Sequence, residues 1–517
     1  MKSIFMAVAL VLEAAMYLSG VRDEESLDPQ LIERLEALEN SPIRINSPGR
    51  NARGILSAYQ LASLEDYRGR CGDILSWEEL ALVDGFGKEF VSVMRPFLSL
   101  ESSSAPGSRD TTRLKGQALV RWAGNGIGGK VKAGMGPYAA SVAIRGKDWT
   151  ASASAEISSW SVVAGDFNIR YGQGAALWTG FAIESLESVQ SYMRKPSGIT
   201  PVCSFLPSEN RGAAVSYSRG CFCADAFATL GRLYGCHGSW LSLKGELGLT
   251  AALDGGVTLF STDGRLSTKA GVFAWEMGLR GKTPGGRFSW LGRAGQWNFA
   301  FQGRYLPTSF TGEGSGNYGL AGGAAWSSGY GPGNHSLSLS LDASLVPKPR
   351  NDPSRRQLRL YLDWTWQVNQ LWKMQARLSG RYRNWEPSRT GLRLDVRYEG
   401  VAWRFAAKAE GCYCSGPGGL LYLEGCRRWK TLEAYAEITA FGTAGWNSRI
   451  YCWQRDAPGT FSVPAYSGLG LYPQVYLAWK KRMGPCTFKA HAKASYMIKR
   501  GKKPAPGFAV QISVSLP

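Results

Sequence analysis

The sequence predicts a small all-α domain followed by a large antiparallel transmembrane β-barrel of roughly 16 to 20 strands. Three observations predict this fold. Apolar residues recur at helical spacing as far as residue 100, residues 101–112 have the composition of a linker, and apolar and polar residues alternate from there to residue 517. We therefore expect a signal segment at 1–20, a helical domain at 21–100, a linker at 101–112 and the barrel at 113–517.

The composition is typical of many short, aromatic-rich strands joined by frequent turns. The 517 residues include 64 Gly, 19 Trp, 22 Tyr and 20 Phe, and the mean hydropathy is −0.19. After the N-terminus, no run reaches the ~18 apolar residues that a membrane helix requires. Only helices and closed barrels satisfy every backbone polar group in lipid. A membrane-spanning chain of this composition must therefore be a barrel.

The first twenty residues have the layout of a secretory signal. Lys2 precedes an apolar run over residues 4–18, and the small residues Ser19 and Gly20 follow it. The alternative interpretation is an amphipathic first helix. As a signal, the segment would export the chain, as an outer-membrane location requires.

Residues 25–100 have helical spacing throughout. Leucines at 27, 31, 35 and 38, with acids between them, predict an amphipathic helix over residues 25–39. Ser76 precedes Trp77 and two glutamates, which predicts an N-cap followed by an acidic first turn. This part is net acidic, so the chain's net charge of +20 belongs to the barrel.

Four consecutive segments between residues 358 and 410 carry apolar side chains on one face and charged side chains on the other. In a barrel, the apolar face contacts outer-membrane lipid and the charged face lines the lumen, where a basic surface attracts anions. The basic side chains of the predicted lumen face are Lys373, Arg377, Arg381, Arg393, Arg397, Arg404 and Lys408.

A soluble β-sandwich would show the same alternation, so alternation alone does not decide the architecture. The barrel is favoured because the alternation continues without helical interruption and because aromatic residues cluster near strand ends. The last segment also carries an apolar face that includes Phe508, Val510 and Ile512. Such a strand suits closure of a barrel.

Residues 82–95 have the layout of a helix-hairpin-helix. Gly85 and Gly87 permit a tight turn, Phe86 would plug the turn into the core, and Lys88 would face a phosphate bound by the free amides of the second helix. A first hairpin is expected near residues 59–63. Residues 41–100 are electrically balanced, which gives little of the counterion-release affinity that DNA binding needs. Two uses stay open: docking a periplasmic protein, or contact with the DNA backbone.

Short motifs in both parts of the chain carry a resemblance to a known family. They are SPIRIN at 41–46, LEDYR at 64–68, SWEEL at 76–80, VDGFG at 83–87, RPF at 95–97, GDFNIRYGQG at 165–174, LWTGF at 177–181 and SENRGAA at 208–214. Together they resemble the helix-hairpin-helix barrel proteins of Bacteroidota outer membranes, whose N-terminal domain is similar to that of the competence protein ComEA. The resemblance implies an outer-membrane location with the helical domain in the periplasm, and by analogy with ComEA it suggests DNA uptake.

No catalytic motif is present. The sequence contains no GxSxG, HExxH or Walker phosphate loop, and its three His are scattered. The ten Cys have no metal-ligand spacing, so we expect neither a metal nor another cofactor, and no enzyme. Four charged residues on the motifs of the barrel, Asp166, Arg170, Glu209 and Arg211, are interpreted as a lumen salt-bridge network.

Two functions remain from the sequence. The first is a channel for anionic cargo or for DNA uptake, in which the periplasmic domain receives or gates the cargo. The second is a non-conducting envelope scaffold, in which a closed barrel anchors a helical domain that docks a periplasmic protein.

Overall fold

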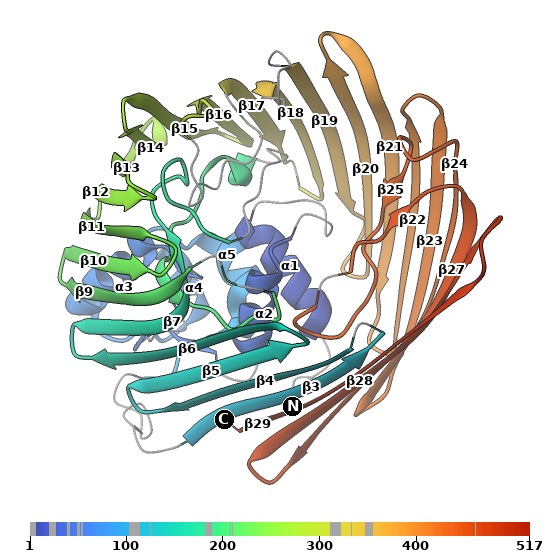
Figure 1. Cartoon of the computed structure of the whole chain (residues 1–517), viewed down its shortest axis with the longest axis horizontal. Coiled ribbons are helices and arrows are strands. Elements are labelled where there is room, and N and C mark those ends of the chain that lie inside the picture. Colours follow the sequence, from blue (N-terminus) through green and yellow to red (C-terminus); the bar gives the residue numbers. More distant parts are fainter. Residues whose placement is uncertain are drawn as a thin grey trace.

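The chain folds into a closed β-barrel with a helical domain inside the ring of strands (Figure 1). The computed structural model describes residues 7–19, 27–38, 42–48, 52, 55–102, 114–124, 126–180, 189–206, 208, 210–310, 322–331, 333–346, 355–460 and 462–516. The predicted order of a small all-α domain followed by an antiparallel barrel is confirmed.

Twenty-four antiparallel strands form the barrel in the described part of the chain. They are β3 (Leu114–Ala123), β4 (Gly126–Met135), β5 (Tyr138–Arg145), β6 (Asp148–Ile157), β7 (Trp160–Arg170), β9 (Arg211–Arg219), β10 (Phe222–Thr229), β11 (Leu233–Ser242), β12 (Gly245–Asp254), β13 (Val257–Thr268), β14 (Gly271–Arg280), β15 (Thr283–Ala294), β16 (Trp297–Tyr305), β17 (Gly322–Tyr330), β18 (His335–Val346), β19 (Arg355–Gln367), β20 (Trp372–Arg383), β21 (Glu386–Glu399), β22 (Trp403–Tyr413), β23 (Pro417–Arg428), β24 (Leu432–Thr443), β27 (Leu469–Met483), β28 (Cys486–Lys499) and β29 (Ala505–Leu516).

The strand number exceeds the expected 16 to 20 because the turns at one end of the barrel are very short, two to four residues each. The barrel closes as predicted, since the apolar last strand β29 pairs with the first strand β3 through Ala509 opposite Ala123 and Leu516 opposite Gly116.

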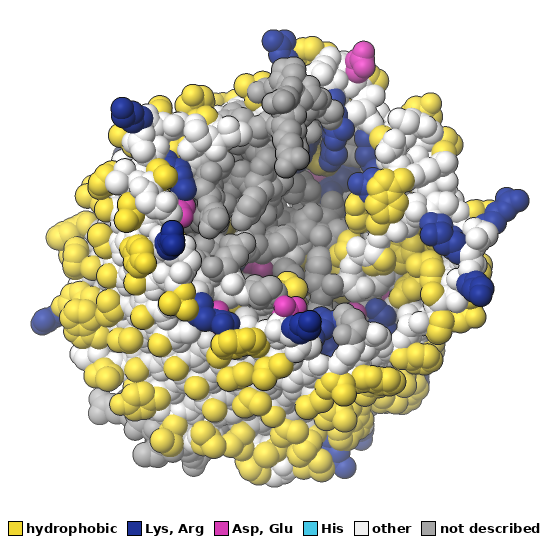
Figure 2. Space-filling model, viewed as in Figure 1, with side chains coloured by type: hydrophobic (Ala, Val, Ile, Leu, Met, Phe, Trp, Pro, Cys, Tyr) yellow, Lys and Arg dark blue, Asp and Glu magenta, His cyan; other side chains and the backbone are white. Residues whose placement is uncertain are grey.

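The two faces of the wall differ as the alternation predicts. On β21 and β22, Leu392 and Trp403 are 50% and 45% exposed on the outside, whereas Asp395 and Arg404 are buried on the inside. Hydrophobic side chains accordingly cover the outer wall in Figure 2. An apolar outer band on a closed barrel is the surface of a membrane-spanning barrel. Among the described residues, no helix is both long and apolar enough to cross a membrane.

The two ends of the barrel are different. The start of β3 and the end of β29 lie at the end that carries the short turns. All the long connections, which include residues 171–210 and 444–468, lie at the opposite end. Barrels of the outer membrane place their short turns in the periplasm and their long loops outside the cell.

Strand β7 leaves the wall halfway along its length. Its first part pairs with β9 as far as Asp166, and its last part, from Phe167 to Arg170, pairs instead with the inner strand β8 (Gly198–Pro201). The bend occurs at Gly165, which has a φ of +99°. A Cβ there would overlap the Ala151 carbonyl oxygen, so only glycine fits.

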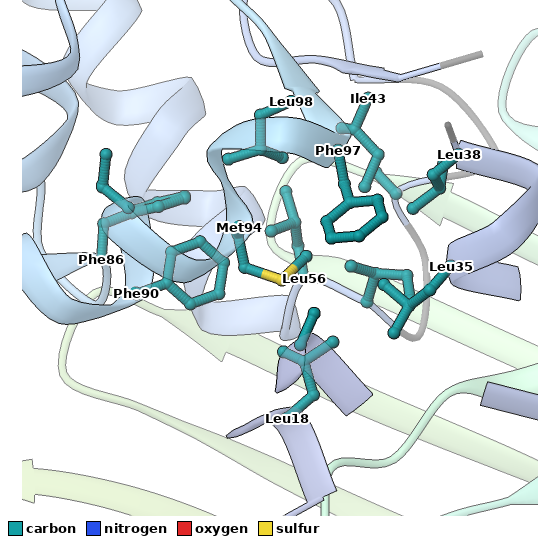
Figure 3. Packing of buried hydrophobic residues seen from close by; sticks show 14 of the residues in the cluster. Leu18, Leu35, Leu38, Ile43, Leu56, Phe86, Phe90, Met94, Phe97 and Leu98 are labelled. Carbon is teal, nitrogen blue, oxygen red and sulfur yellow. The ribbon is translucent and has the colours of Figure 1, made fainter. Parts of the chain in front are cut away.

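The helical domain has a core of its own (Figure 3). Its elements are α1 (Ala7–Ser19), α2 (Pro29–Leu38), β1 (Ile43–Arg44), α3 (Ala58–Cys71), α4 (Trp77–Leu82), α5 (Gly87–Met94), η3 (Arg95–Phe97) and β2 (Leu98–Ser99). Parallel pairing of β1 with β2 joins the two ends of the domain. The Asn46 side chain also donates to the Ile74 carbonyl oxygen at 2.9 Å and accepts from the Ile74 amide at 2.8 Å.

Two helix predictions are confirmed and one is wrong. Helix α2 lies within the predicted range, and Ser76 caps α4 by accepting from the Glu79 amide at 3.0 Å. The expected first hairpin near residues 59–63 is wrong, because these residues form the first turns of α3. Ser57 and Gln60 form a capping box that starts this helix just before them.

The domain boundaries expected at residues 20, 100 and 112 stay predictions, because residues 20–26 and 103–113 lie outside the described residues. Within the expected signal segment, α1 packs Val11, Ala14 and Ala15 into the core of the helical domain.

Candidate functional site in the barrel lumen

Helix α2 contacts the inner wall of the barrel through charged groups. Glu33 lies 2.6 Å from Lys132 Nζ and 3.0 Å from Lys130 Nζ, both on β4. Burial alone would raise the pKa of Glu33, but the ammonium groups of Lys132 and Lys130 outweigh burial and hold its pKa below the ordinary value. The Glu33 carboxylate is therefore ionised and engaged by two wall lysines.

Further polar contacts join the helical domain to the inward part of β7 and to the wall. Asp28 lies 3.4 Å from Arg170, and the Asn168 amide donates to Gln30 at 2.7 Å. On the other side, the guanidinium of Arg265 on β13 lies 5.4 Å from the ring centre of Tyr59. All these contacts are polar or cation–π in character.

The interior of the helical domain is apolar by contrast. Buried side chains from all its helices, among them Leu35, Phe90, Met94 and Phe97, form one cluster (Figure 3). Among the described hydrophobic residues outside the helical domain, Trp453 of the second inward loop packs against this cluster, and α3 also lies beside β11. The core of the helical domain is thus built almost entirely from the domain's own side chains.

The motif at 165–180 builds an inward loop that fills part of the lumen. The carboxylate of Glu276 on β14 accepts hydrogen bonds from the backbone amides of Gln173, Ala175 and Ala176 at 2.8, 2.7 and 2.9 Å. Gly172 must be glycine, because its φ is +53° and a Cβ would lie 2.8 Å from Glu276. The motif therefore anchors a loop around a buried carboxylate.

The predicted charged cluster of the barrel is divided between two places. Asp166 pairs with Arg211 at 3.0 Å, whereas Arg170 turns inward to Asp28 of the helical domain. Glu209 lies outside the described residues.

The Asp166–Arg211 pair also bonds to the backbone of β6. Asp166 accepts from the Ala151 amide at 2.7 Å, and Arg211 donates to the Trp149 carbonyl oxygen at 3.1 Å. These two side chains thus bond to backbone groups of β6 at the point where β7 has left the wall.

A second inward loop, residues 444–468, contains strands β25 (Ile450–Tyr451) and β26 (Ala465–Tyr466). Arg455 in this loop donates two hydrogen bonds of 2.9 Å to Glu424 of the wall. Asp456 lies 3.1 Å from Arg121 and 3.3 Å from Lys493, again on the wall. Both inward loops are thus fixed to the barrel by buried charged groups.

Several members of the predicted basic lumen face have acidic partners. Arg377 lies 2.6 Å from Asp363, Arg393 lies 2.7 Å from Asp395, and Arg404 lies 2.8 Å from Glu399. Lys408 lies 3.8 Å from the Cys452 sulfur of the second inward loop. Because each of these three arginines has an acidic partner, they add less positive potential to the lumen than three unpaired arginines would.

The remaining members stand opposite other bases. Lys373 is in register with Arg397, and Arg381 lies between Arg359 on β19 and Arg389 on β21. Like charges directly across a sheet repel each other. Figure 2 shows Lys and Arg side chains gathered on the inner wall beside β19 and β20. We name Arg359, Arg381 and Arg389 the arginine row. Arg359 and Arg389 are not among the predicted site residues, because only strand register shows that they lie beside Arg381.

The glycine hairpin joins α4 to α5. Gly85 and Gly87 have φ values of +86° and +70°, Phe86 is buried, and Lys88 is exposed. The Gly85 carbonyl oxygen accepts from the Gln60 side chain at 2.8 Å, which attaches the turn to α3. Asp84 and Glu89 flank the amides at the start of α5. Contact with DNA phosphate stays a prediction.

Within the described residues, no group of three His, Cys, Asp or Glu side chains could hold a metal ion. All ten cysteines are free thiols. A cavity of about 470 Å³ lies between the helical domain and the first inward loop, and another of about 920 Å³ lies between α2 and the wall.

Among solved structures, the chain is similar in fold to bacterial outer-membrane barrels. A chain of the E. coli P pilus tip assembly intermediate PapC-PapD-PapK-PapG has a TM-score of 0.47 at 11% identity, covering 79% of this chain and 61% of that one. This chain thus spans about three fifths of that chain. The copper transporter OprC has a TM-score of 0.40 at 8% identity, and the match covers 78% of this chain and 80% of that one. Pseudomonas aeruginosa OccK5 has a TM-score of 0.32 at 8% identity, and the match covers 78% of this chain and 97% of that one.

No family model and no curated protein sequence matches the chain. Because the structural similarities are this distant, the assignment as a barrel rests on the strand register and the apolar outer wall.

Proposed function

We propose that this chain is an outer-membrane barrel that passes anionic cargo and is closed from the periplasmic side by its own helical domain. The observation that carries the proposal is the contrast between the apolar core of the helical domain and its polar seat on the wall. When the domain leaves, water can replace the partners of its charged groups, whereas a domain that shared a core with the barrel would expose apolar surface.

The width of the barrel supports a channel. Barrels of 16 to 18 strands already leave an aqueous pore, and larger ones hold a plug. This barrel has 24 strands and a lumen occupied by a helical domain and two loops. The barrel termini lie at the end with short turns, which supports a periplasmic position for the helical domain.

The arginine row supports anionic cargo. Three guanidinium groups side by side on neighbouring strands attract a negatively charged solute more strongly than alternating charges do. Nucleic acid is one such cargo, and the glycine hairpin with Lys88 would then meet the phosphate backbone. Membership in the helix-hairpin-helix barrel family and the absence of enzyme activity are part of the same proposal.

Conductance in planar bilayers tests the proposal. We expect the full chain to be closed, whereas a variant lacking residues 21–100 and a Lys130→Glu/Lys132→Glu variant conduct anions. Heat-modifiable migration in gels verifies that each variant has folded. Absence of current in both folded variants would overturn the channel. Short DNA added to an open variant tests nucleic acid as cargo through block of the current.

A scaffold is the second candidate, because one observation favours it. Leu75, just before α4, and Leu82, its last residue, are 79% and 80% exposed. Exposed leucines at both ends of a short helix suit docking of a periplasmic protein. The scaffold predicts no current in any variant, so the same experiment separates the two candidates.

A further inference from the structure

The cavity of about 920 Å³ between α2 and the wall is strongly basic. Eight Lys or Arg side chains line it, against two acidic side chains, Glu33 and Glu36, which both belong to α2. Its walls include residues of β3, β4, β27, β28 and β29, at the end of the barrel with short turns. The barrel thus contributes bases to the lining of this cavity, whereas the acids of the lining come from the helical domain.

Strand register places these bases side by side. Lys480 on β27 is directly opposite Lys489 on β28, and Lys489 is opposite Ser513 on β29. Two strands further along the same row, past Leu119 on β3, lies Lys130 on β4. Bases gathered in this way on one face of a sheet give a positive field that attracts anions.

The adjacent row, one pleat closer to the short turns, adds hydrogen-bond donors. It runs from Arg482 through Thr487, Ser515 and Gln117 to Lys132. Ammonium and guanidinium groups interleaved with hydroxyls and an amide suit the oxygens of phosphate-type groups. A volume of about 920 Å³ accommodates several such groups at once.

Glu33 links this cavity to the seat of the helical domain. Its carboxylate is bound to Lys130 and Lys132, which are at the same time two of the cavity's bases. An anion that fills the cavity therefore competes with Glu33 for the same two ammonium groups. Occupancy of the cavity and seating of the helical domain exclude each other at these lysines.

We infer that this cavity binds a soluble anion carrying several phosphate-type groups, and that the bound anion displaces Glu33 and releases the helical domain. The release step deepens the proposed function and rests on it, whereas the binding site stands on the cavity alone. The anion would act as the signal that opens the barrel.

Binding is tested with tripolyphosphate as the probe, by titration calorimetry on the full chain in detergent at constant ionic strength. A Lys480→Gln/Lys489→Gln variant removes two bases of the cavity. A Lys502→Gln/Lys503→Gln variant removes the same charge from the turn at the opposite end. We expect the first variant to bind roughly tenfold more weakly and the second to bind like the wild type. Equal binding by all three, or no binding by the wild type, would overturn the site.

Release is tested by trypsin cleavage within residues 27–102 of the full chain. We expect tripolyphosphate to speed cleavage severalfold in the wild type and in the Lys502/Lys503 control, but not in the Lys480/Lys489 variant. Binding without faster cleavage would overturn the release step. If the probe binds and speeds cleavage while the variant lacking residues 21–100 carries no current, the channel proposal fails and this site stands.

Discussion

The carboxylate of Glu33 on α2 lies 2.6 Å from Lys132 Nζ and 3.0 Å from Lys130 Nζ on β4. One side chain of the helical domain thus engages two on the wall. Replacing Glu33 by Gln leaves both lysines without this carboxylate, and breaking such a partly buried pair costs about 3 kcal/mol of seating free energy. We expect faster trypsin cleavage of the helical domain in the full chain and a rise in conductance. Asp66→Asn, which breaks an exposed pair within α3, is the matched control and should change neither.

Low pH should release the helical domain. The pKa of Glu33 is held below its ordinary value of 4.5 when the domain is seated. A carboxyl with a depressed pKa stabilises the seated state above its ordinary pKa, and this contribution is lost as the pH falls through the depressed pKa. Trypsin is inactive there, so pepsin cleavage or conductance below pH 4.5 is measured. The Glu33→Gln variant should lack this pH step, and an identical step in both proteins would contradict the assignment.

Glu276 should decide whether the first inward loop stays closed. Its buried carboxyl group accepts three backbone amides, and leaving a buried donor without its acceptor costs about 1–3 kcal/mol. A glutamine side chain offers a single acceptor oxygen, so Glu276→Gln should destabilise the loop by roughly 3 kcal/mol. Hydrogen exchange at residues 173–176 should then rise by about a hundredfold. Glu386→Gln, at an exposed turn, is the control, and equal exchange in both would contradict the anchor.

Gly165→Ala should impair assembly of the barrel. The added methyl would overlap the Ala151 carbonyl oxygen, and a φ of +99° is strained for any other residue. Such strain costs about 1–3 kcal/mol, before the clash is counted. We expect less heat-modifiable, folded protein and a lower unfolding temperature. Gly411→Ala, where a Cβ meets nothing within 4 Å, should fold like the wild type.

The arginine row should set the anion preference of the open barrel. In the variant lacking residues 21–100, Arg381→Gln removes the middle charge of the row and should lower the chloride-to-potassium permeability ratio by roughly twofold. Reversal potentials in a salt gradient measure this ratio. Lys147→Gln, which removes a charge from an exposed turn, should leave it unchanged, and equal ratios in both variants would contradict the role of the row.

The fold was predictable from the sequence because alternation reports directly on the two faces of a strand. Leu392 and Trp403 point to lipid while Asp395 and Arg404 point inward, as the period of two requires. The number of strands was not predictable, because it depends on how short the turns between the strands are. The expected first hairpin is instead the start of a helix, because Ser57 and Gln60 form a capping box that begins α3.

The candidate site was predictable only in part. Single residues such as Arg381 could be assigned to the lumen, but their pairing depends on register across strands, which one sequence does not supply. The seat of the helical domain depends on Glu33 meeting Lys130 and Lys132, which lie 97 and 99 residues away in the chain. No local pattern encodes a contact of this kind.

The departure of β7 at Gly165 has a mechanical consequence for the barrel. Around most of the circumference, backbone hydrogen bonds join neighbouring strands and share tension around the ring. Between β6 and β9, beyond Gly165, the Asp166–Arg211 pair and its bonds to Ala151 and Trp149 carry that tension instead. We therefore expect this seam to depend on side-chain bonds when the barrel wall is stretched.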